Sequence, residues 1–289
     1  MTETRVVRHA DPHAFLAVAL PLLEREAAAY GGLVAWARAL RQKPRLRTSP
    51  GMFWTVEADE RVLAFGMQRE QGPLVIGDSD PAGSILLAEA LARRHASVPG
   101  LLGSLAACEA FVAAWEPLSG HAHRLRFRLR NYVLSGPPPR VAAAGRARAA
   151  IEADLDLVVA WLGAFIDEAR VPDDKTGLRA SAAARIAEAK LWLWIDRRPR
   201  ALLGFMRVDD VTGRIVTVYT PPEFRRRGYA RALTAEVATM LRAIGCTRVH
   251  LTADSANRSS NALYASLGFE PAGDHFHFDF VLPRRSVAL

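Results

Sequence analysis

Cysteine and lysine are scarce in this sequence. The two cysteines, Cys108 and Cys246, lie in separate halves of the chain, which excludes a disulfide framework and a cysteine-based metal centre. Only three of the 38 basic residues are lysines, and the formal net charge is +8. This arginine excess suits anionic ligands. Because the arginines are scattered and no recognition module is visible, we expect no nucleic acid partner.

Long apolar runs are also missing. No stretch approaches the roughly 20 consecutive apolar residues of a membrane-spanning helix. The apolar stretch at 14–23 is short and runs directly into Glu24, Arg25 and Glu26, unlike a secretory signal. We therefore expect a soluble cytoplasmic protein with buried thiols and no membrane partner.

A proline-rich segment divides the chain. With 289 residues, the chain is long enough for about two domains. The segment SGPPPRVAAAG at 135–145 places three consecutive prolines before a run of small residues, which the interior of a helix or strand does not accommodate. We therefore predict one domain over residues 1–138 and a second over residues 139–289.

The second half predicts a mixed α/β fold. Alternating apolar residues indicate strands, and apolar residues at helical spacing indicate helices. Asp154 or Asp156 is expected to cap the first helix. The expected elements are, in order, strand 146–151, helices 155–169 and 179–189, strands 190–196, 201–208 and 215–220, a helix that follows Arg227 and ends at Gly245, strand 247–253, helix 259–267 and strand 275–281.

The first half repeats this order loosely. It predicts a helix near 12–29, three strands between 53 and 77, a helix at 84–95, a strand at 100–105, a helix at 106–116 and a strand at 124–133. The repetition indicates a second, diverged copy of the same fold.

The segment PPEFRRRGYARAL at 221–233 carries the clearest chemistry. It joins a strand that ends in proline to the start of a helix. The first backbone N–H groups of a helix have no partner within the helix, and with the macrodipole they attract anions. Gly228 has no Cβ, so an anion can approach the backbone closely, and Ala230 is small for the same reason. The alternative is a solvated surface turn.

Two motifs together resemble the GNAT acetyltransferase superfamily. The spacing Arg-x-x-Gly-x-Ala in this strand–turn–helix context resembles the family's pyrophosphate loop. The segment 257–269 resembles its second motif through Asn257, Ser260, Leu263, Tyr264, Gly268 and Phe269. The resemblance covers about 139–289 and implies a GNAT fold there. The chain is also similar to tandem-type GNAT proteins. This similarity implies that residues 1–138 form a degenerate GNAT-like domain without a coenzyme loop.

The resemblance implies that acetyl-CoA is the co-substrate. The edge of strand 215–220 would lie along the pantetheine arm through Val218, Tyr219 and Thr220. The residues implied around the pyrophosphate are Arg225, Arg226, Arg227, Gly228, Tyr229, Ala230 and Arg231.

The short helix at 259–267 would complete the site. By resemblance, Asn257 and Ser260 contact the coenzyme, and Tyr264 faces the sulfur as a general acid. A phenol with a pKa near 10 is a suitable proton donor to a thiolate whose acid has a pKa of about 8.5. The alternative for Tyr264 is a core aromatic residue, and the alternative for Asn257 is a helix N-cap.

The general base is the least defined part of the site. Several family members carry a glutamate at the start of the central strand, where this chain has Arg214, which cannot accept a proton. A water relayed by backbone carbonyls is one option. Glu223, Asp167 and Asp254 are the carboxylate candidates.

These motifs predict an acetyl-CoA-dependent N-acetyltransferase. Its acceptor would be the amine of a small molecule or a peptide, and the sequence leaves open a homo-oligomer. The rival interpretation is a catalytically silent CoA-binding sensor or scaffold, which the missing glutamate favours. A nucleic-acid binder driven by charge is a third class.

Two further segments suggest ligands and are interpreted as structural. His275, His277 and Asp279 share one face of strand 275–281, but no third metal ligand is evident, so we expect a polar strand face and no metal. Segment 77–89 has glycines but no arginines, and Asp78 and Asp80 would repel a pyrophosphate. We therefore expect no coenzyme in the first half. The same segment loosely resembles a calcium loop without the full ligand pattern.

Overall fold

The computed structural model of the chain describes residues 4–25, 30–35, 51–59, 61–69, 72–78, 80–170 and 175–281. It divides into two compact units. Unit 1 comprises Met1–Asn131, Asp254–Ala256 and Gly273–Leu289, and unit 2 comprises Tyr132–Ala253 and Asn257–Ala272. Within the described ranges, no helix combines the length and apolar character needed to cross a bilayer.

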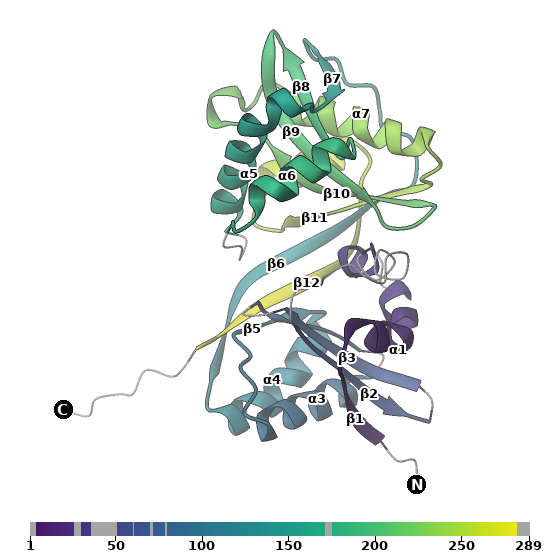
Figure 1. The fold of residues 1–289 in the computed structure, drawn as a ribbon, viewed down its shortest axis with the longest axis vertical. Coiled ribbons are helices and arrows are strands. Elements are labelled where there is room, and N and C mark those ends of the chain that lie inside the picture. Colours follow the sequence, from purple (N-terminus) through teal and green to yellow (C-terminus); the bar gives the residue numbers. More distant parts are fainter. Residues whose placement is uncertain are drawn as a thin grey trace, which may run out of the picture. The chain divides into compact units, whose positions relative to one another are not determined.

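Unit 2 has the predicted order of strands and helices, which is confirmed (Figure 1). Its sheet follows the order β11-β10-β9-β8-β7, and β10 and β11 are parallel while their neighbours are antiparallel. The elements are β7 (Arg146–Ala149), α5 (Leu155–Ala169), α6 (Leu178–Ala187), β8 (Leu191–Asp196), β9 (Arg198–Arg207), β10 (Thr212–Tyr219), α7 (Tyr229–Ala243), β11 (Arg248–Asp254) and α8 (Arg258–Ser266).

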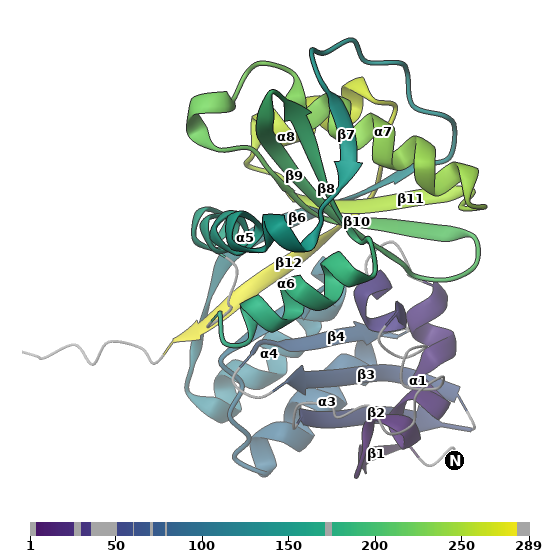
Figure 2. The ribbon, with the colours of Figure 1, turned by 45° about the horizontal axis from the view of Figure 1, so that its top comes forward.

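Helices cover both faces of the unit 2 sheet (Figure 2). Successive side chains of a strand point to opposite faces. Leu203 of β9 therefore joins the core cluster with Val237 of α7, whereas Leu202 joins a second cluster with Val158 of α5. Gly213 of β10 faces α7, because an added Cβ would lie 2.9 Å from Leu241. The opposite face is the one under α5 and α6.

Helix α5 starts at Leu155 as predicted, but the expected side-chain cap by Asp154 is not formed. A 3₁₀ turn over Glu152–Asp154 precedes the helix, and Asp154 makes no side-chain cap to α5. Its carboxylate instead accepts hydrogen bonds from the Arg148 guanidinium at 2.6 Å and from the Ile151 N–H at 2.9 Å. These bonds hold the pKa of Asp154 below its usual range, the Arg148 bond most strongly. The Asp154 carboxylate therefore links strand β7 to the 3₁₀ turn and does not cap the helix.

Unit 1 repeats the element order of unit 2, as predicted. Its sheet follows the order β1-β2-β3-β4-β5-β12-β6, and β4 and β5 are parallel, as β10 and β11 are. The elements are β1 (Thr4–His9), α1 (Pro12–Arg25), β2 (Gly51–Ala58), β3 (Arg61–Arg69), β4 (Leu74–Asp78), α3 (Pro81–Arg93), β5 (Gly100–Gly103), α4 (Leu105–Ser119), β6 (Ala122–Leu134) and β12 (Glu270–Val281).

The two units do not coincide with the two predicted halves, 1–138 and 139–289. From Gly273 onward the chain belongs to unit 1, because β12 pairs with β5 in the register Phe276↔Gly103 to Asp279↔Gly100. The last strand of the chain thus completes the sheet of unit 1. Sequence periodicity predicts that a strand exists here but carries no information on which edge it joins.

The sequence predicts the polar side chains of β12 on an outer or substrate-facing surface, but the structure buries the two histidines. His275 is 9% exposed and His277 is 6% exposed, and the centres of the Tyr30 and Phe127 rings lie 5.2 and 5.9 Å from those of their respective rings. The His275 ring lies 2.8 Å from the Asn131 amide nitrogen, and burial lowers the pKa of His277. Across the residues that the structure describes, no group of histidine, cysteine and carboxylate side chains could hold a metal ion.

Candidate functional site

The turn between β10 and α7 has the backbone of an anion-binding loop. Pro221 and Pro222 end the strand, a 3₁₀ turn over Pro222–Phe224 follows, and α7 begins at Tyr229. Arg226 and Gly228 have positive φ values of 60° and 79°. An added Cβ on Gly228 would meet no atom within 4 Å, so the space beside this backbone is open. The positive φ of residue 228 favours glycine there, and the space beside its backbone is open to a ligand.

The N-terminus of α7 carries no side-chain cap. Gly228 is the N-cap residue, and no side chain among the described residues accepts from the first N–H groups of the helix. These groups, with the helix dipole, form a positive end suited to a pyrophosphate. The geometry fits the predicted roles of Gly228, Tyr229 and Ala230.

The Arg225 side chain turns back onto the protein. Its Nε donates to the Thr220 carbonyl at 2.9 Å, and its Nη2 donates to both carboxylate oxygens of Glu168 on α5, at 2.8 and 2.6 Å. The guanidinium also lies 6.0 Å from the centre of the Tyr219 ring. Arg225 therefore fixes the turn to α5, while Arg226 and Arg227 are exposed.

The first turn of α7 is also tied to neighbouring elements. The Tyr229 hydroxyl donates to Asp196 Oδ2 of β8 at 2.7 Å, and this bond raises the pKa of Tyr229. Arg231 Nη2 lies 3.5 Å from the Ser266 carbonyl of α8. Ala230 is half-buried. The helix start is thus held rigidly from two sides.

Strands β10 and β11 separate beside this turn. They pair from Thr212 to Arg214 of β10 with Arg248 to His250 of β11. Beyond Arg214, β10 keeps its partner β9 as far as Tyr219, and in the described part of the chain β11 offers it no further pair. The two strands therefore separate beyond Arg214. This separation leaves one edge of Val218, Tyr219 and Thr220 without a strand partner.

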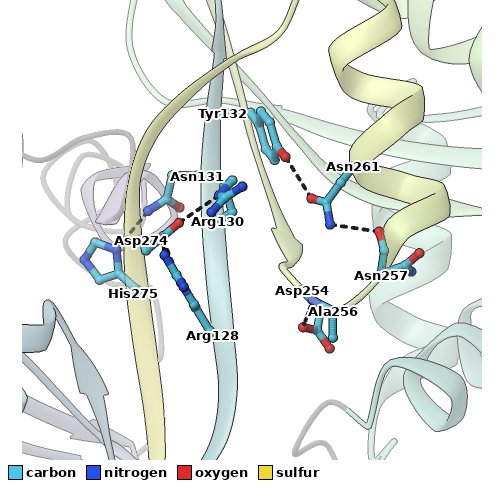
Figure 3. A network of polar contacts seen from close by, with 10 residues as sticks. All are labelled: Arg128, Arg130, Asn131, Tyr132, Asp254, Ala256, Asn257, Asn261, Asp274 and His275. Atoms are coloured by element: carbon cyan, nitrogen blue, oxygen red, sulfur yellow. Dashed lines mark hydrogen bonds and ion pairs between the residues drawn. The ribbon is translucent and has the colours of Figure 1, made fainter.

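Asn257 is the N-cap residue of helix α8, which confirms the alternative interpretation of this residue. Asn257 Oδ1 accepts from the Ser260 N–H at 3.0 Å. The Asn257 carbonyl also accepts from Asn261 Nδ2 at 2.8 Å, and Asn261 Oδ1 accepts from the Tyr132 hydroxyl at 2.8 Å (Figure 3). Contact of Asn257 and Ser260 with a coenzyme stays a prediction.

Tyr264 lies in the core of unit 2. It is 7% exposed, and its ring centre lies 5.9 Å from both Tyr132 and Phe269. Burial raises the pKa of the Tyr264 phenol well above its usual value, so the hydroxyl carries its proton at neutral pH. The core interpretation is confirmed, and the role of general acid stays a prediction.

The carboxylate candidates for the general base lie in different surroundings. Asp167 forms an ion pair with Lys175 at 2.6 Å, and Glu223 is exposed. Asp254 belongs to unit 1, where its Oδ1 accepts from the Ala256 N–H at 2.8 Å. Arg214 donates to Thr252 Oγ1 at 2.6 Å, and burial lowers its pKa to about 10. Arg214 is therefore a buried cation at neutral pH.

Sequence reasoning missed Glu168, Asp196 and Asn261. Each bonds a tyrosine or arginine that lies 57, 33 or 129 positions away along the chain. Local patterns carry no signal for such pairs. Asn261, four residues after Asn257, is the only one with a local cue, because i and i+4 share a helix face.

Comparison with known proteins identifies this arrangement. The model of the acetyltransferase (GNAT) family matches residues 159–269. Mycothiol acetyltransferase of Beutenbergia cavernae is 37% identical over 91 residues, which are 30% of this chain and 31% of that protein. N-acetyltransferase 8 of Homo sapiens is 30% identical over 112 residues, which are 36% of this chain and 48% of that protein. The matches thus span about a third and about half of these relatives.

A solved structure extends the likeness to the whole chain. A tandem GNAT protein from the clavulanic acid biosynthesis pathway aligns with a TM-score of 0.61 at 17% identity, covering 96% of this chain and 98% of that one. At this identity the likeness shows the fold alone, and it does so for both units. Residues 159–269 therefore form an acetyltransferase domain of the GNAT family.

Proposed function

We propose that unit 2 binds acetyl-CoA and transfers its acetyl group to the amine of a small molecule or a peptide. The observation that carries this proposal is the uncapped N-terminus of α7, with Gly228 facing open space beside the separated strands β10 and β11. When bound, acetyl-CoA supplies an acyl group activated as a thioester.

The chain's own residues supply binding and orientation. The N–H groups at the start of α7 would hold the pyrophosphate, and Arg225 would keep the turn in place through Glu168. The free edge of Val218, Tyr219 and Thr220 offers backbone groups to the pantetheine arm and to the charge that develops on the acyl oxygen. Holding both reactants in one geometry is a large part of the rate enhancement.

Tyr264 is the proposed proton donor. Its phenol is protonated at neutral pH, as a general acid requires before the reaction. As the amine nitrogen bonds to the acyl carbon and the carbon–sulfur bond breaks, Tyr264 Oη gives its proton to the departing thiolate. The amine nitrogen loses one proton to water, and Tyr264 takes one proton back from water, so that the step balances.

Calorimetric titration with acetyl-CoA tests this proposal. We expect one site per chain in the wild type and a loss of at least about 100-fold in affinity, or about 2.7 kcal/mol, in Gly228→Glu. Gly245→Glu is the matched control, because Gly245 follows the other end of α7, has a φ of 99° and also faces open space. Equal binding by the wild type and Gly228→Glu would contradict the phosphate loop.

A coenzyme-binding sensor without turnover is the second candidate. It is favoured by Arg214, which occupies the position where the resembled family carries glutamate. A panel of amines with detection of the released thiol separates the two candidates. Binding of acetyl-CoA without acetylation of any amine supports the sensor, and release of thiol with any amine supports the enzyme.

A further inference from the structure

An arginine with a buried guanidinium nitrogen lies under helix α6 in unit 2. Arg185 extends from α6 so that its guanidinium covers Gly204 of β9. An added Cβ on Gly204 would collide with Arg185 Nη2 and would lie 3.2 Å from Cζ. Only glycine at this position lets the guanidinium rest on the strand.

Among the described residues, no counter-charge pairs with the guanidinium group of Arg185. Its Nη2 is buried and has no hydrogen-bond partner, and within the described ranges no carboxylate forms an ion pair with it. Burial lowers the pKa of Arg185. Placing a cation out of water without a partner is costly, and such exceptions call for a functional explanation.

A second arginine lies on the same face of the sheet. Gly204 pairs with Thr217 of β10, and Met206, two residues further along β9, pairs with Arg214. Residues opposite each other in a sheet share a face, as do residues two apart in one strand. Arg214 and the Arg185 head therefore lie on the face under α5 and α6. Arg214 is also the last β10 residue paired with β11, at the point where the strands separate.

The nearby carboxylate is already engaged. Glu168 of α5 accepts from Arg225 and from the Tyr219 hydroxyl, which lies 3.3 Å away. The sheet face beside the proposed acyl-transfer point thus carries two buried cations. The carboxylate of Glu168 on this side already pairs with Arg225 of the coenzyme turn. An anion fits a buried guanidinium that has no counter-charge. The planar fork of arginine also matches a carboxylate in two parallel hydrogen bonds.

We propose that the acyl acceptor is an amine that also carries a carboxylate, and that Arg185 binds this carboxylate. The inference rests on the proposed function, since it names the acceptor class of the same unit. Arg185 as a residue is half-buried, so part of its side chain is reached by solvent although Nη2 is not. Arg214 adds positive potential beside it.

Thermal unfolding with propionate tests the carboxylate site without any need for turnover. We expect 50 mM propionate to raise the Tm of the wild type by about 2 °C over propionamide at equal ionic strength, as mass action requires of a ligand of the folded state. In Arg185→Met this difference should vanish. Arg179→Met is the matched control, because Arg179 is on the same helix but is 62% exposed and paired with Asp156.

Each outcome decides the proposal. A response in the wild type and Arg179→Met but not in Arg185→Met supports it. No response in the wild type, or equal responses in all three proteins, overturns it. If Arg185→Met gives no cooperative transition, Arg185→Lys keeps the charge but loses the fork, and at most half of the response should remain. An undiminished response in Arg185→Lys overturns the proposal.

Acetyl-CoA titration of the same proteins keeps the two proposals apart. Arg185→Met should bind acetyl-CoA as the wild type does. If neither the wild type nor Arg185→Met binds acetyl-CoA, the proposed function is refuted. The propionate measurement does not depend on acetyl-CoA binding and tests the carboxylate site separately. With amines that are acetylated, the wild type should prefer an amino acid over its amide by at least about 10-fold in kcat/KM, and Arg185→Met should lose this preference.

Discussion

The same strand–turn–helix element is built twice in this chain, with opposite treatment of the helix N-terminus. In unit 1, Asp80 caps α3, and its carboxylate accepts from the Ala82 N–H at 2.9 Å. Pro81 follows and has no N–H to offer. In unit 2, Gly228 precedes α7 and provides no side chain. Unit 1 thus fills its anion site with its own carboxylate, whereas unit 2 leaves it open.

The glycines of the two turns serve different purposes. In unit 1, an added Cβ on Gly83 would lie 2.8 Å from Ala64, and one on Gly77 would collide with the Phe65 ring. In unit 2, an added Cβ on Gly228 would touch nothing. The unit 1 glycines permit close packing inside the protein, while Gly228 permits close approach from outside. The absence of a coenzyme site in unit 1 stays a prediction, and the Asp80 cap supports it. The side chain of Asp78 lies outside the described residues.

The helices after β5 and β11 are both capped by a side chain and differ in one buried ring. Ser104 caps α4 by accepting from the Ala107 N–H, and Asn257 caps α8 by accepting from the Ser260 N–H. Seven residues after each cap lies a buried aromatic ring, Phe111 in unit 1 and Tyr264 in unit 2. The packing role of the ring is kept in both units, but only unit 2 has a hydroxyl. The proposed proton donor therefore lies in the same unit as the open anion site.

Tyr264→Phe makes unit 2 resemble unit 1 and should have the largest effect. We expect kcat to fall by about 100-fold, the lower end of what general acid catalysis contributes, with the affinity for acetyl-CoA unchanged. Thiol release and calorimetry measure the two quantities. Tyr132→Phe is the control, because it removes the same atom from the neighbouring ring, and its kcat should stay within about 3-fold. Equal losses in both variants would contradict the role of Tyr264.

Arg225→Met tests how the open turn of unit 2 is held. We expect acetyl-CoA affinity to fall by about 10-fold, because the turn loses its ties to Glu168 and to the Thr220 carbonyl. Glu168→Gln should weaken binding by about 3-fold if the ion pair positions the turn, and the double variant should be less than additive. Tighter binding in Glu168→Gln would show instead that Arg225 acts by its charge on the phosphate.

Asp80→Ala should have the smallest effect, and it should lower only the stability of the protein. Loss of the N-cap of α3 should cost about 1 kcal/mol of unfolding free energy, with acetyl-CoA affinity unchanged. Urea denaturation followed by circular dichroism measures the loss, and Asp80→Asn, which keeps a capping oxygen, should retain most of the stability. A change in acetyl-CoA affinity would argue against the separation of roles between the two turns.

Much of the fold and of the coenzyme turn could be predicted from the sequence. The element order follows from apolar periodicity, which is local. The turn at 221–228 follows from two prolines that cannot continue a strand and from a glycine before a helix. The motif at 257–269 implied a coenzyme contact for Asn257 and an acid role for Tyr264, and the structure confirms the two alternatives, a helix N-cap and a core aromatic residue. The cap expected of Asp154 failed, because a neighbouring arginine competes for its carboxylate.

The sequence by itself determined which segments become strands, helices and turns, because these depend on backbone dihedral angles, N–H groups and side-chain spacing within a few residues. Only the tertiary structure decided which partners they meet. It placed Glu168 on Arg225, joined β12 to β5 and so buried His275 and His277, and laid Arg185 over Gly204. Such pairings depend on which strand edges and helix faces come together across tens of residues, and no local pattern encodes them.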